Sequence, residues 1–360
     1  MSKEPSILVV AHTPFQIVVA CHVLRLYYPQ AEVDLCISET IRGAKKLVVN
    51  ARETNAFRNV IHLKNGRHFV SGKLRSAFSW VRYIIDNYKA ACFLSRSSYD
   101  IVLFSNISVL AKMLVRRLKK SNPLCKFQIF EEGMSTYTQR FADGDSRSTL
   151  YRRFIDKTGV LDCLDTLYVF NPVFLAWKPA HGQIQELPKI SPDNIAFREL
   201  INHIFDYDHI RDIYDKKLIF FEESHFLEGY SVPDVELVEK MADKVGKDNI
   251  MVKIHPRNPH NRFAQLGYKT NTDTAIPWEV IMLNQKLTDK ILVTISSGSV
   301  IYPYLYFGIE AKSYSLIRCL DEPPGLMKGE MGKLMETVYS TYPNVFKAPS
   351  SFEEFLSELC

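Results

Sequence analysis

An acidic pair followed by glycine, Glu131-Glu132-Gly133, comes directly after the apolar run at residues 126–130. Two adjacent carboxylates hold one another's pKa up, and a carboxylate with a raised pKa accepts a proton from an attacking hydroxyl. The glycine lets the chain turn sharply at this point. A solvated turn explains the motif at least as well when it is taken alone, so both interpretations stay open.

A histidine between cationic residues follows a second apolar run, in the sequence K-I-H-P-R at residues 253–257. Pro256 prevents the strand from continuing beyond this point. His255 can donate a proton near neutral pH, and the flanking Lys253 and Arg257 could attract an anion. A structural histidine is the alternative, and the motif alone does not separate the two roles.

A carboxylate, Glu279, stands in the first turn of an expected helix at residues 278–284, after Pro277. An acid at this position stabilises the helix through its dipole, and the local sequence favours this ordinary role. The alternative is a carboxylate that binds the two neighbouring hydroxyls of a ribose.

Three serines and a glycine, Ser296-Ser297-Gly298-Ser299, lie between an expected strand at residues 291–295 and an expected helix at 300–307. Hydroxyls and free amide N–H groups at the start of a helix can cradle a phosphate. The same residues also supply an ordinary helix cap, and the two roles are compatible.

Strand-length apolar runs alternate with helical stretches along most of the chain, which predicts an α/β fold with parallel sheets covered on both faces. The expected elements of the first half are strands 6–11, 33–37, 58–63, 99–104, 126–130 and 166–170 and helices 15–28, 73–94 and 107–120. Those of the second half are strands 217–221, 250–254, 291–295 and 312–316 and helices 232–245, 278–284 and 300–307.

A stretch rich in proline, asparagine and glycine at residues 171–192 separates the halves and is the expected linker. We therefore expect two doubly wound domains that face each other across a cleft. Ligands of open α/β sheets bind beyond the carboxyl ends of the strands. Because the motifs follow expected strands or open a helix, we expect their side chains to meet in one site.

Composition restricts the class of protein. The 360 residues are 46% hydrophobic and 24% charged, which argues against a disordered or fibrous chain. A net charge of +5 over this length argues against a nucleic-acid binder. No run approaches the roughly 18 apolar residues that cross a bilayer, and the first residues form no signal peptide, so we expect a cytoplasmic protein.

A metal site is not expected from this sequence. The seven cysteines are scattered and form no C-x-x-C pair, which argues against a zinc site or a disulfide framework. His255 and His260 lack a third ligand of suitable spacing. Two D-x-D patterns, at residues 143–145 and 206–208, lie in an expected charged loop and an expected helix and are poor candidates.

Five basic residues share the expected helix at 107–120: Lys112, Arg116, Arg117, Lys119 and Lys120. A solvated helix face is the favoured interpretation. The alternative is contact with anionic lipid head groups, which would place the protein peripherally at the inner face of the cell membrane.

Taken in order, these short motifs resemble those of bacterial sialyltransferases. The E-E-G, H-P, P-W-E and S-S motifs are similar to those of glycosyltransferase family 52, the lipooligosaccharide and capsular polysaccharide sialyltransferases. Polysialyltransferases and Pasteurella-type sialyltransferases share them. The opening T-P-F-Q at residues 13–16 resembles the start of family 52 sequences. His255 and Glu279 are 24 residues apart, Glu279 and Ser297 are 18 apart, and the resemblance spans residues 8–300.

The resemblance implies a GT-B-like fold of two Rossmann-type domains. Residues 1–175 would form the acceptor-side domain and residues 193–345 the donor domain, with the closing segment 346–360 packed back on the first domain. It also implies an inverting transfer of sialic acid from CMP-sialic acid to a terminal galactose-type hydroxyl of a surface glycan, in capsule or lipooligosaccharide biosynthesis. No metal or other cofactor is expected.

The same resemblance implies roles for single residues. Glu131 would be the general base, with Glu132 as its neighbour and fallback. His255 would act on the departing CMP phosphate as acid or hydrogen-bond donor. The expected donor-binding residues are Ser296 and Ser297 for the phosphate, Glu279 for the ribose, and also Lys253, Pro256, Gly298, Thr13 and Gln16. The base could instead follow the strand at 217–221, where the candidates are Glu222, Glu223 and Glu228.

Two other functions stay open. One is a transferase of the same fold that uses a UDP-hexose, because family 52 also includes glucosyltransferases. The other is a non-catalytic paralogue that binds a glycan or a nucleotide. Some relatives form domain-swapped dimers, so a homodimer is an alternative to a monomer.

Overall fold

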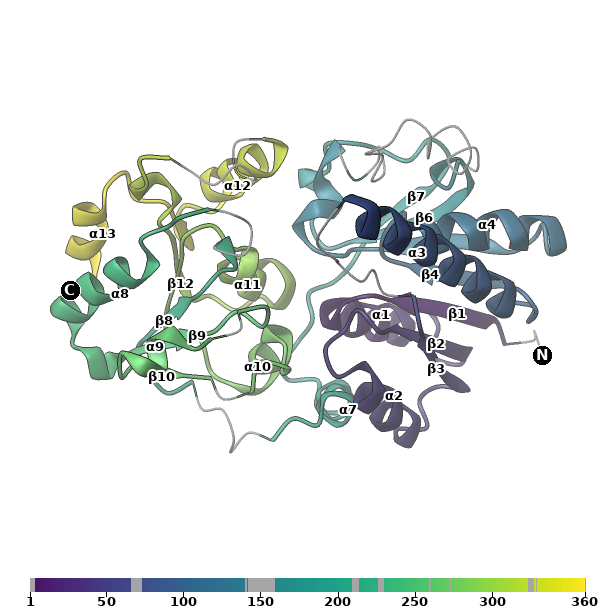
Figure 1. Ribbon diagram of the computed structural model, residues 1–360, viewed down its shortest axis with the longest axis horizontal. Helices are drawn as coiled ribbons and strands as arrows, with labels where there is room; N and C mark the ends of the chain where they lie inside the picture. Colours follow the sequence, from purple (N-terminus) through teal and green to yellow (C-terminus); the bar gives the residue numbers. More distant parts are fainter. Residues whose placement is uncertain are drawn as a thin grey trace. The chain divides into compact units, whose positions relative to one another are not determined.

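The computed structural model describes residues 4–65, 73–139, 141, 159–208, 214–225, 230–258, 260–271, 273–322, 327 and 329–359. The chain divides into two compact units. Met1–Pro188 and Glu199–Asp206 form the first unit, and Lys189–Arg198 and Tyr207–Cys360 form the second. Each unit contains one parallel sheet flanked by helices (Figure 1), which confirms the α/β fold expected from the alternating apolar runs.

The first sheet has the strand order β3-β2-β1-β4-β5-β6-β7, and its paired neighbours are all parallel. The strands are β1 (Ser6–Ala11), β2 (Glu32–Ser38), β3 (Asn59–Leu63), β4 (Ile101–Phe104), β5 (Lys126–Phe130), β6 (Leu164–Val169) and β7 (Gln183–Glu186). The helices are α1 (Pro14–Tyr27), α2 (Ala44–Glu53), α3 (Lys73–Leu94) and α4 (Val109–Ser121), and α7 (Ile195–Phe205) gives its later residues to this unit.

The second sheet has the order β10-β9-β8-β11-β12-β13 and is also parallel. Its strands are β8 (Leu218–Phe221), β9 (Ile250–Lys253), β10 (Lys269–Thr270), β11 (Ile291–Thr294), β12 (Lys312–Ser315) and β13 (Phe346–Lys347). Its helices are α8 (Asp234–Val245), α9 (Arg262–Gln265), α10 (Trp278–Asn284), α11 (Tyr302–Phe307), α12 (Glu330–Thr341) and α13 (Phe352–Glu358). In both sheets the order reverses beside the first strand, between β1 and β4 and between β8 and β11.

One strand lies where the sequence predicts a linker. The pattern of apolar runs ends the first half at residues 166–170, but β7 continues the sheet by pairing with β6. β7 has the sequence Q-I-Q-E, and all four residues are exposed. An edge strand of this kind lacks the apolar run by which the buried strands are recognised.

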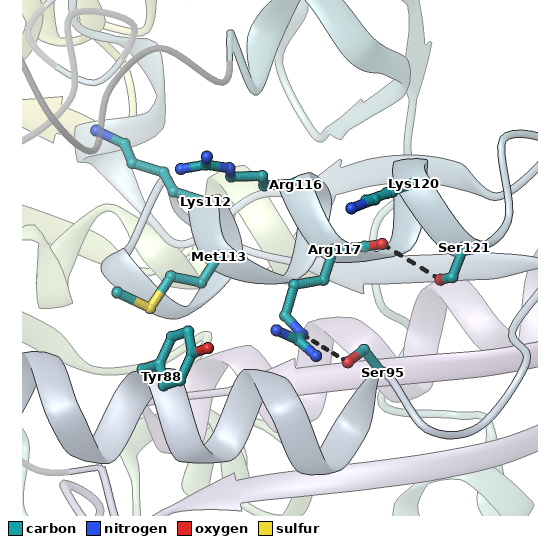
Figure 2. Close-up of a pocket in the computed structure, with 8 residues that line it drawn as sticks. All are labelled: Tyr88, Ser95, Lys112, Met113, Arg116, Arg117, Lys120 and Ser121. Carbon is teal, nitrogen blue, oxygen red and sulfur yellow. Dashed lines mark hydrogen bonds between the residues drawn. The ribbon is translucent and has the colours of Figure 1, made fainter.

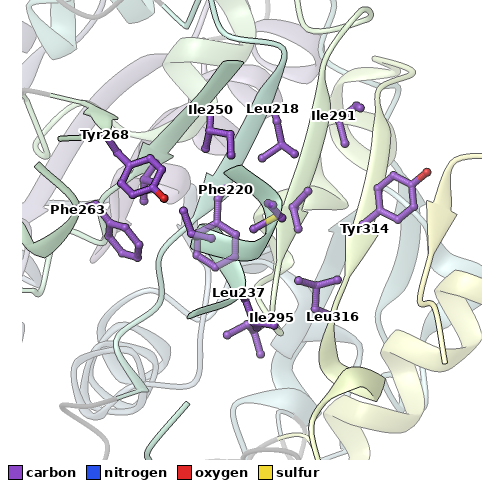
Figure 3. Packing of buried hydrophobic residues seen from close by; sticks show 14 of the residues in the cluster. Leu218, Phe220, Leu237, Ile250, Phe263, Tyr268, Ile291, Ile295, Tyr314 and Leu316 are labelled. Atoms are coloured by element: carbon purple, nitrogen blue, oxygen red, sulfur yellow. The ribbon is translucent and has the colours of Figure 1, made fainter. Parts of the chain in front are cut away.

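The closing segment belongs to the second unit, so the expectation that it packs on the first domain is wrong. β13 pairs with β12, and the Phe355 side chain of α13 is fully buried in the core of the second unit. Its ring lies 5.1 Å from that of Tyr314, which also donates a hydrogen bond to Glu358. Figure 3 shows this core around Phe220, and the apolar face of α13 completes it.

Among the helices of the described ranges, none is both long enough and apolar enough to cross a membrane. The same ranges contain no group of three His, Cys, Asp or Glu side chains that could hold a metal ion. The D-x-D pattern at 206–208 follows α7 instead of lying within it, and Asp206 forms an ion pair with Lys46. The other D-x-D pattern, at 143–145, lies outside the described residues.

Candidate active site at the carboxyl edge of the second sheet

Three polar loops gather at the point where the order of the second sheet reverses. Residues 222–225 follow β8, residues 254–258 follow β9 and residues 295–299 follow β11, and these three strands are neighbours in the sheet. Because the strands are parallel, their carboxyl ends lie at one edge, where α/β sheets bind ligands. The sequence-predicted residues of the second unit that the structure describes lie in or beside these loops.

Glu223, in the loop after β8, accepts hydrogen bonds from residues at or after the ends of both neighbouring strands. One carboxylate oxygen accepts hydrogen bonds from the Thr294 hydroxyl (2.8 Å) and the Ser296 amide (2.7 Å). The other oxygen accepts from the Ser296 hydroxyl (2.6 Å) and lies 3.1 Å from Nε2 of His225. Burial acts to raise the Glu223 pKa, but the bonds from His225 and Ser296 outweigh it, so this pKa lies below its usual value. Glu223 is therefore a fixed anion.

Glu222 anchors the loop at residues 254–258, here called the histidine loop, to the end of β8. Its side chain is fully buried, and one carboxylate oxygen accepts a hydrogen bond from the His255 amide (3.2 Å). The other oxygen accepts from a guanidinium nitrogen of Arg262 (2.9 Å), which also bonds Asp234 (2.6 Å). Since both Glu222 oxygens are bonded inside the protein, this carboxylate supports the loop.

His255 has a defined hydrogen-bonding arrangement. Its Nδ1 accepts a hydrogen bond from the Arg257 amide at 3.2 Å, so the neutral ring carries its proton on Nε2. Pro256 between them is exposed and ends the strand, as the sequence predicts. The Arg257 guanidinium donates to the Ser224 hydroxyl (2.5 Å), and the Asn258 side-chain amide donates to the Glu223 carbonyl (3.2 Å). The β8 and β9 loops are thus joined, with a half-buried imidazole donor between them.

Lys253 and Glu279 are both buried, and the lysine charge acts on the glutamate carboxyl. Lys253 is the last residue of β9, and Glu279 lies in the first turn of α10, directly after Pro277 and Trp278. Burial raises the Glu279 pKa, and the charge of Lys253 offsets part of that rise. The Trp278 indole donates a hydrogen bond to the Ser299 carbonyl (3.0 Å). This bond fixes α10 to the loop at residues 295–299, here called the serine loop.

The serine loop is held by its own hydroxyls. Ser297 accepts a hydrogen bond from the Ser299 amide (3.1 Å) and donates to the Ser299 hydroxyl (2.9 Å), so it caps the short helix at Gly298–Val300. A Cβ added at Gly298 would meet the Tyr302 ring at 2.9 Å, which explains the glycine. The Ser299 hydroxyl accepts this hydrogen bond from Ser297, so its own O–H can donate to a further acceptor.

The acidic pair of the first unit serves two different purposes. Glu131 is fully buried, and one of its oxygens accepts hydrogen bonds from the Tyr137 hydroxyl (2.5 Å) and the Phe170 amide (2.9 Å). Glu132 is half-buried, accepts from the Ser135 hydroxyl (2.6 Å) and bonds the Asn106 side chain. Burial raises the Glu132 pKa, and these two bonds lower it by less. Glu131 joins β5 to β6, while Glu132 is the more accessible carboxylate.

Thr13 and Gln16 lie in the first unit, at the start of α1. Thr13 caps α1 by accepting from the Gln16 amide (3.3 Å), and Pro14 follows in the first turn, as expected for a helix start. The Gln16 side chain is buried and accepts from the His12 amide (2.6 Å). Both hydrogen bonds are local, and a role in donor binding stays a prediction.

The structure links four sequence-predicted residues directly: Glu222, Glu223, His255 and Ser296. It adds residues that sequence reasoning missed, which are Ser224, His225, Asp234, Arg262 and Thr294, and it gives Arg257 a bridging role to Ser224. A signal for Ser224 and His225 existed, because E-E-S-H follows the central strand β8. No comparable signal marks Arg262, which comes from a separate helix. Glu228 lies outside the described residues.

Comparison with known proteins places the chain in a family. The model of the alpha-2,8-polysialyltransferase (POLYST) family matches residues 7–315. A search of curated proteins finds no match. A solved glycotransferase of kitacinnamycin is 13% identical over 99% of this chain and 91% of its own, with a TM-score of 0.58.

Two further solved structures are similar to this chain. The UDP-GlcNAc 2-epimerase of Methanocaldococcus jannaschii is 12% identical over 98% of this chain and 91% of its own, with a TM-score of 0.54. The spinosyn rhamnosyltransferase SpnG, complexed with thymidine diphosphate, is 9% identical over 99% and 90%, with a TM-score of 0.54. At these identities the similarity shows the fold alone, and it confirms the GT-B-like class of two Rossmann-type domains.

The family match covers most of the chain and includes the E-E-G, H-P, P-W-E and S-S motifs. It confirms the expected resemblance to bacterial sialyltransferases. Together with the fold, it identifies a glycosyltransferase of the sialyltransferase type. The chain belongs to the alpha-2,8-polysialyltransferase (POLYST) family.

Proposed function

We propose that this protein transfers sialic acid from CMP-sialic acid to a hydroxyl of a galactose-terminated glycan, with inversion. The observation that carries the proposal is the fixed His255 tautomer, with its Nε2–H donor at the carboxyl end of β9 and the buried cation Lys253 two residues before it. An N–H donor beside a buried positive charge suits the departing phosphate of CMP.

The second unit would bind the donor. Lys253 and His255 would stabilise charge on the phosphate, and the Ser297–Ser299 pair would donate a hydroxyl hydrogen to it. Glu279 is buried in α10 and feels the positive charge of Lys253. It would accept hydrogen bonds from the two ribose hydroxyls. Ser296 would act through its bonds to Glu223, which hold the loop in place.

The general base would be Glu132 instead of Glu131. Glu131 is fully buried and bonded to Tyr137 and to the Phe170 amide. Glu132 combines partial exposure with a raised pKa, and a carboxylate with a raised pKa is the stronger base. Glu222 and Glu223 fit the role less well, because their oxygens are bonded within the second unit.

In the proposed step the acceptor hydroxyl oxygen attacks the anomeric carbon of the sialyl group from the face opposite CMP. The new glycosidic C–O bond forms as the bond to the phosphate oxygen breaks, and CMP leaves with that electron pair. Glu132 takes the proton of the attacking hydroxyl, and the Nε2–H of His255 donates a hydrogen bond to the phosphate oxygen, which leaves as an anion. Glu132 then releases its proton to solvent.

A donor panel tests the proposal. The purified protein is incubated with lactose and either CMP-sialic acid or UDP-hexoses, and the released nucleotide and the product mass are measured. Release of CMP with a sialylated product supports the proposal, and release of UDP from a hexose donor would replace it with the alternative transferase. If the protein turns over neither CMP-sialic acid nor a UDP-hexose, the result would favour a non-catalytic binding paralogue. EDTA should leave the rate unchanged, because protein groups carry each proposed role. A cytoplasmic location stays part of the proposal.

A further inference from the structure

A cavity of about 730 Å³ lies between α3 and α4 of the first unit. Four of its eight lining residues are cationic, and none of the eight carries a carboxylate: Tyr88, Ser95, Lys112, Met113, Arg116, Arg117, Lys120 and Ser121. Figure 2 shows Arg116 and Lys120 along one side of α4, with Tyr88 facing Met113 from α3. The cavity therefore combines positive charge with an apolar part.

The two helices concentrate the positive charge of the chain. Their described side chains, at residues 79–94 and 109–121, include seven lysines and arginines and one aspartate, a net +6. The whole chain carries +5, so the rest of the sequence sums to −1. Such an uneven distribution creates a local positive field that attracts anionic surfaces. The +5 total hides this feature.

An exposed apolar stripe runs along α3 beside the cavity. Val81, Ile85 and Tyr88 are 53%, 45% and 53% exposed, and their spacing of four and three residues puts them on one face of the helix. Tyr88 belongs to both features, because it lines the cavity and the Arg117 guanidinium lies 5.8 Å from its ring centre. The apolar stripe and the cationic cavity are thus one continuous surface.

Hydrogen bonds hold part of this surface in a fixed arrangement. The Arg117 guanidinium donates to the Ser95 hydroxyl (2.9 Å), and the Ser121 hydroxyl donates to the Arg117 carbonyl (3.2 Å). The first bond fixes the end of α3 to α4, and the second lies within the last turn of α4. Arg116 and Lys120, one turn apart on α4, remain exposed beside them.

We propose that this surface docks the protein on an anionic phospholipid bilayer. Cationic side chains gain about 1 kcal/mol each near an anionic leaflet, and apolar side chains on the same face can enter the boundary between head groups and acyl chains. A soluble polyanion would use the cations but would gain nothing from Val81 and Ile85. The combination therefore favours a bilayer, with the phosphate groups of lipids over the cavity and the stripe of α3 in the interface.

Vesicle sedimentation tests this proposal. The full chain is mixed with phosphatidylcholine vesicles, with or without phosphatidylglycerol, at an ionic strength of about 0.1 M, where the Debye length is about 10 Å. We expect binding that depends on phosphatidylglycerol. The double substitution Arg116→Gln/Lys120→Gln should weaken it about 30-fold, and Val81→Ser/Ile85→Ser should weaken it about tenfold.

A matched control removes the same charge elsewhere. Lys244 and Lys333 are exposed lysines of the second unit, and Lys244→Gln/Lys333→Gln should change vesicle binding by no more than about twofold. Equal losses of vesicle binding in this control and in Arg116→Gln/Lys120→Gln would overturn the proposal. Wild-type binding that does not depend on phosphatidylglycerol would overturn it as well. Binding of dextran sulfate that depends on Arg116 and Lys120 but not on Val81 and Ile85, without vesicle binding, would assign the surface to a soluble polyanion instead.

Transfer to a soluble acceptor should be unchanged in the Arg116→Gln/Lys120→Gln and Val81→Ser/Ile85→Ser variants, which also shows that they are folded. Vesicle binding and transfer are separate measurements. Failure of one proposal therefore leaves the other to be decided by its own assay.

Discussion

Ser296 binds the Glu223 carboxylate twice, through its amide at 2.7 Å and its hydroxyl at 2.6 Å. This pairing joins the ends of β8 and β11, the strands between which the order of the second sheet reverses. Ligands of α/β sheets bind at such a junction. The position of the serine loop therefore depends on an anion that the protein itself supplies.

Glu223→Gln should raise the KM for CMP-sialic acid and lower kcat/KM about tenfold or more. An amide nitrogen cannot accept a hydrogen bond, so one end of the substituted side chain would face two donors. Steady-state kinetics with a varied donor concentration measures the effect. Glu236→Gln is the control, because it removes the same charge from an exposed pair with Lys240 on α8. A Glu223→Gln enzyme with normal donor kinetics would show that the loop does not need this anion.

Glu131→Gln and Glu132→Gln should separate structure from chemistry. Glu131→Gln places an amide among the Tyr137 hydroxyl and the Phe170 amide and should lower the free energy of unfolding by about 2–4 kcal/mol. Glu132→Gln should leave that free energy within about 1 kcal/mol and reduce kcat about 10²–10⁴-fold. Urea unfolding and transfer rates, measured on both variants, give the comparison.

The pH profile adds a readout for Glu132. A base must lose its proton before it can act, so kcat/KM should rise with pH through a pKa above the usual glutamate value. Glu132→Gln should abolish that acidic limb, and Glu132→Asp should partly restore it. If Glu132→Gln keeps both the rate and the limb, the base lies elsewhere.

Acidification should destabilise the first unit through His22. Burial lowers the His22 pKa to about 4, and its ring bond to the Pro188 carbonyl offsets only part of that effect. Between pH 6.5 and about 4 the unfolded chain therefore binds a proton at His22 that the folded chain does not bind. The free energy of unfolding falls as the pH is lowered through this range. We expect a loss of about 2 kcal/mol at pH 5 from this group. In His22→Phe, the difference between unfolding free energies at pH 7 and pH 5 should shrink by that amount, and an unchanged difference would contradict the assignment.

Phe355→Ala should destabilise the second unit by about 3–5 kcal/mol, because it removes a fully buried ring from its core. Hydrogen exchange of β11 and β12 should quicken, while that of β1 and β4 should not. Phe352→Ala, at a partly buried position of the same helix, should cost less. Faster exchange confined to the first sheet would mean that α13 supports the other unit.

The sequence predicts the inner strands well, because apolar runs such as Ser6–Ala11 and Ile291–Thr294 are the direct signature of strands buried on both faces. It does not predict β7, whose polar residues form an exposed edge. It also misplaces α13, because an amphipathic helix shows that an apolar face must be covered but not which unit covers it. Local patterns identify elements, whereas docking partners depend on contacts that are distant along the chain.

The same limit applies to the candidate site. The rule that ligands bind beyond strand ends selects the loops that hold His255 and Ser296, and it also selects Glu222 and Glu223. It cannot tell Glu131 from Glu132, since adjacent residues after a strand turn to opposite sides and only one is fully buried. Arg262 acts through Glu222 from 40 residues away, and no spacing rule connects the two.

Transfer from CMP-sialic acid by wild-type, His255→Ala and His260→Ala proteins tests the central claim most directly. His260 is an exposed histidine five residues beyond His255 and controls for the loss of an imidazole. Mass spectrometry of a lactose acceptor should show a sialylated product with the wild-type and His260→Ala proteins and a rate about 10²–10⁴-fold lower with His255→Ala. An equal rate from His255→Ala, or no sialylated product from the wild-type protein, would contradict the account.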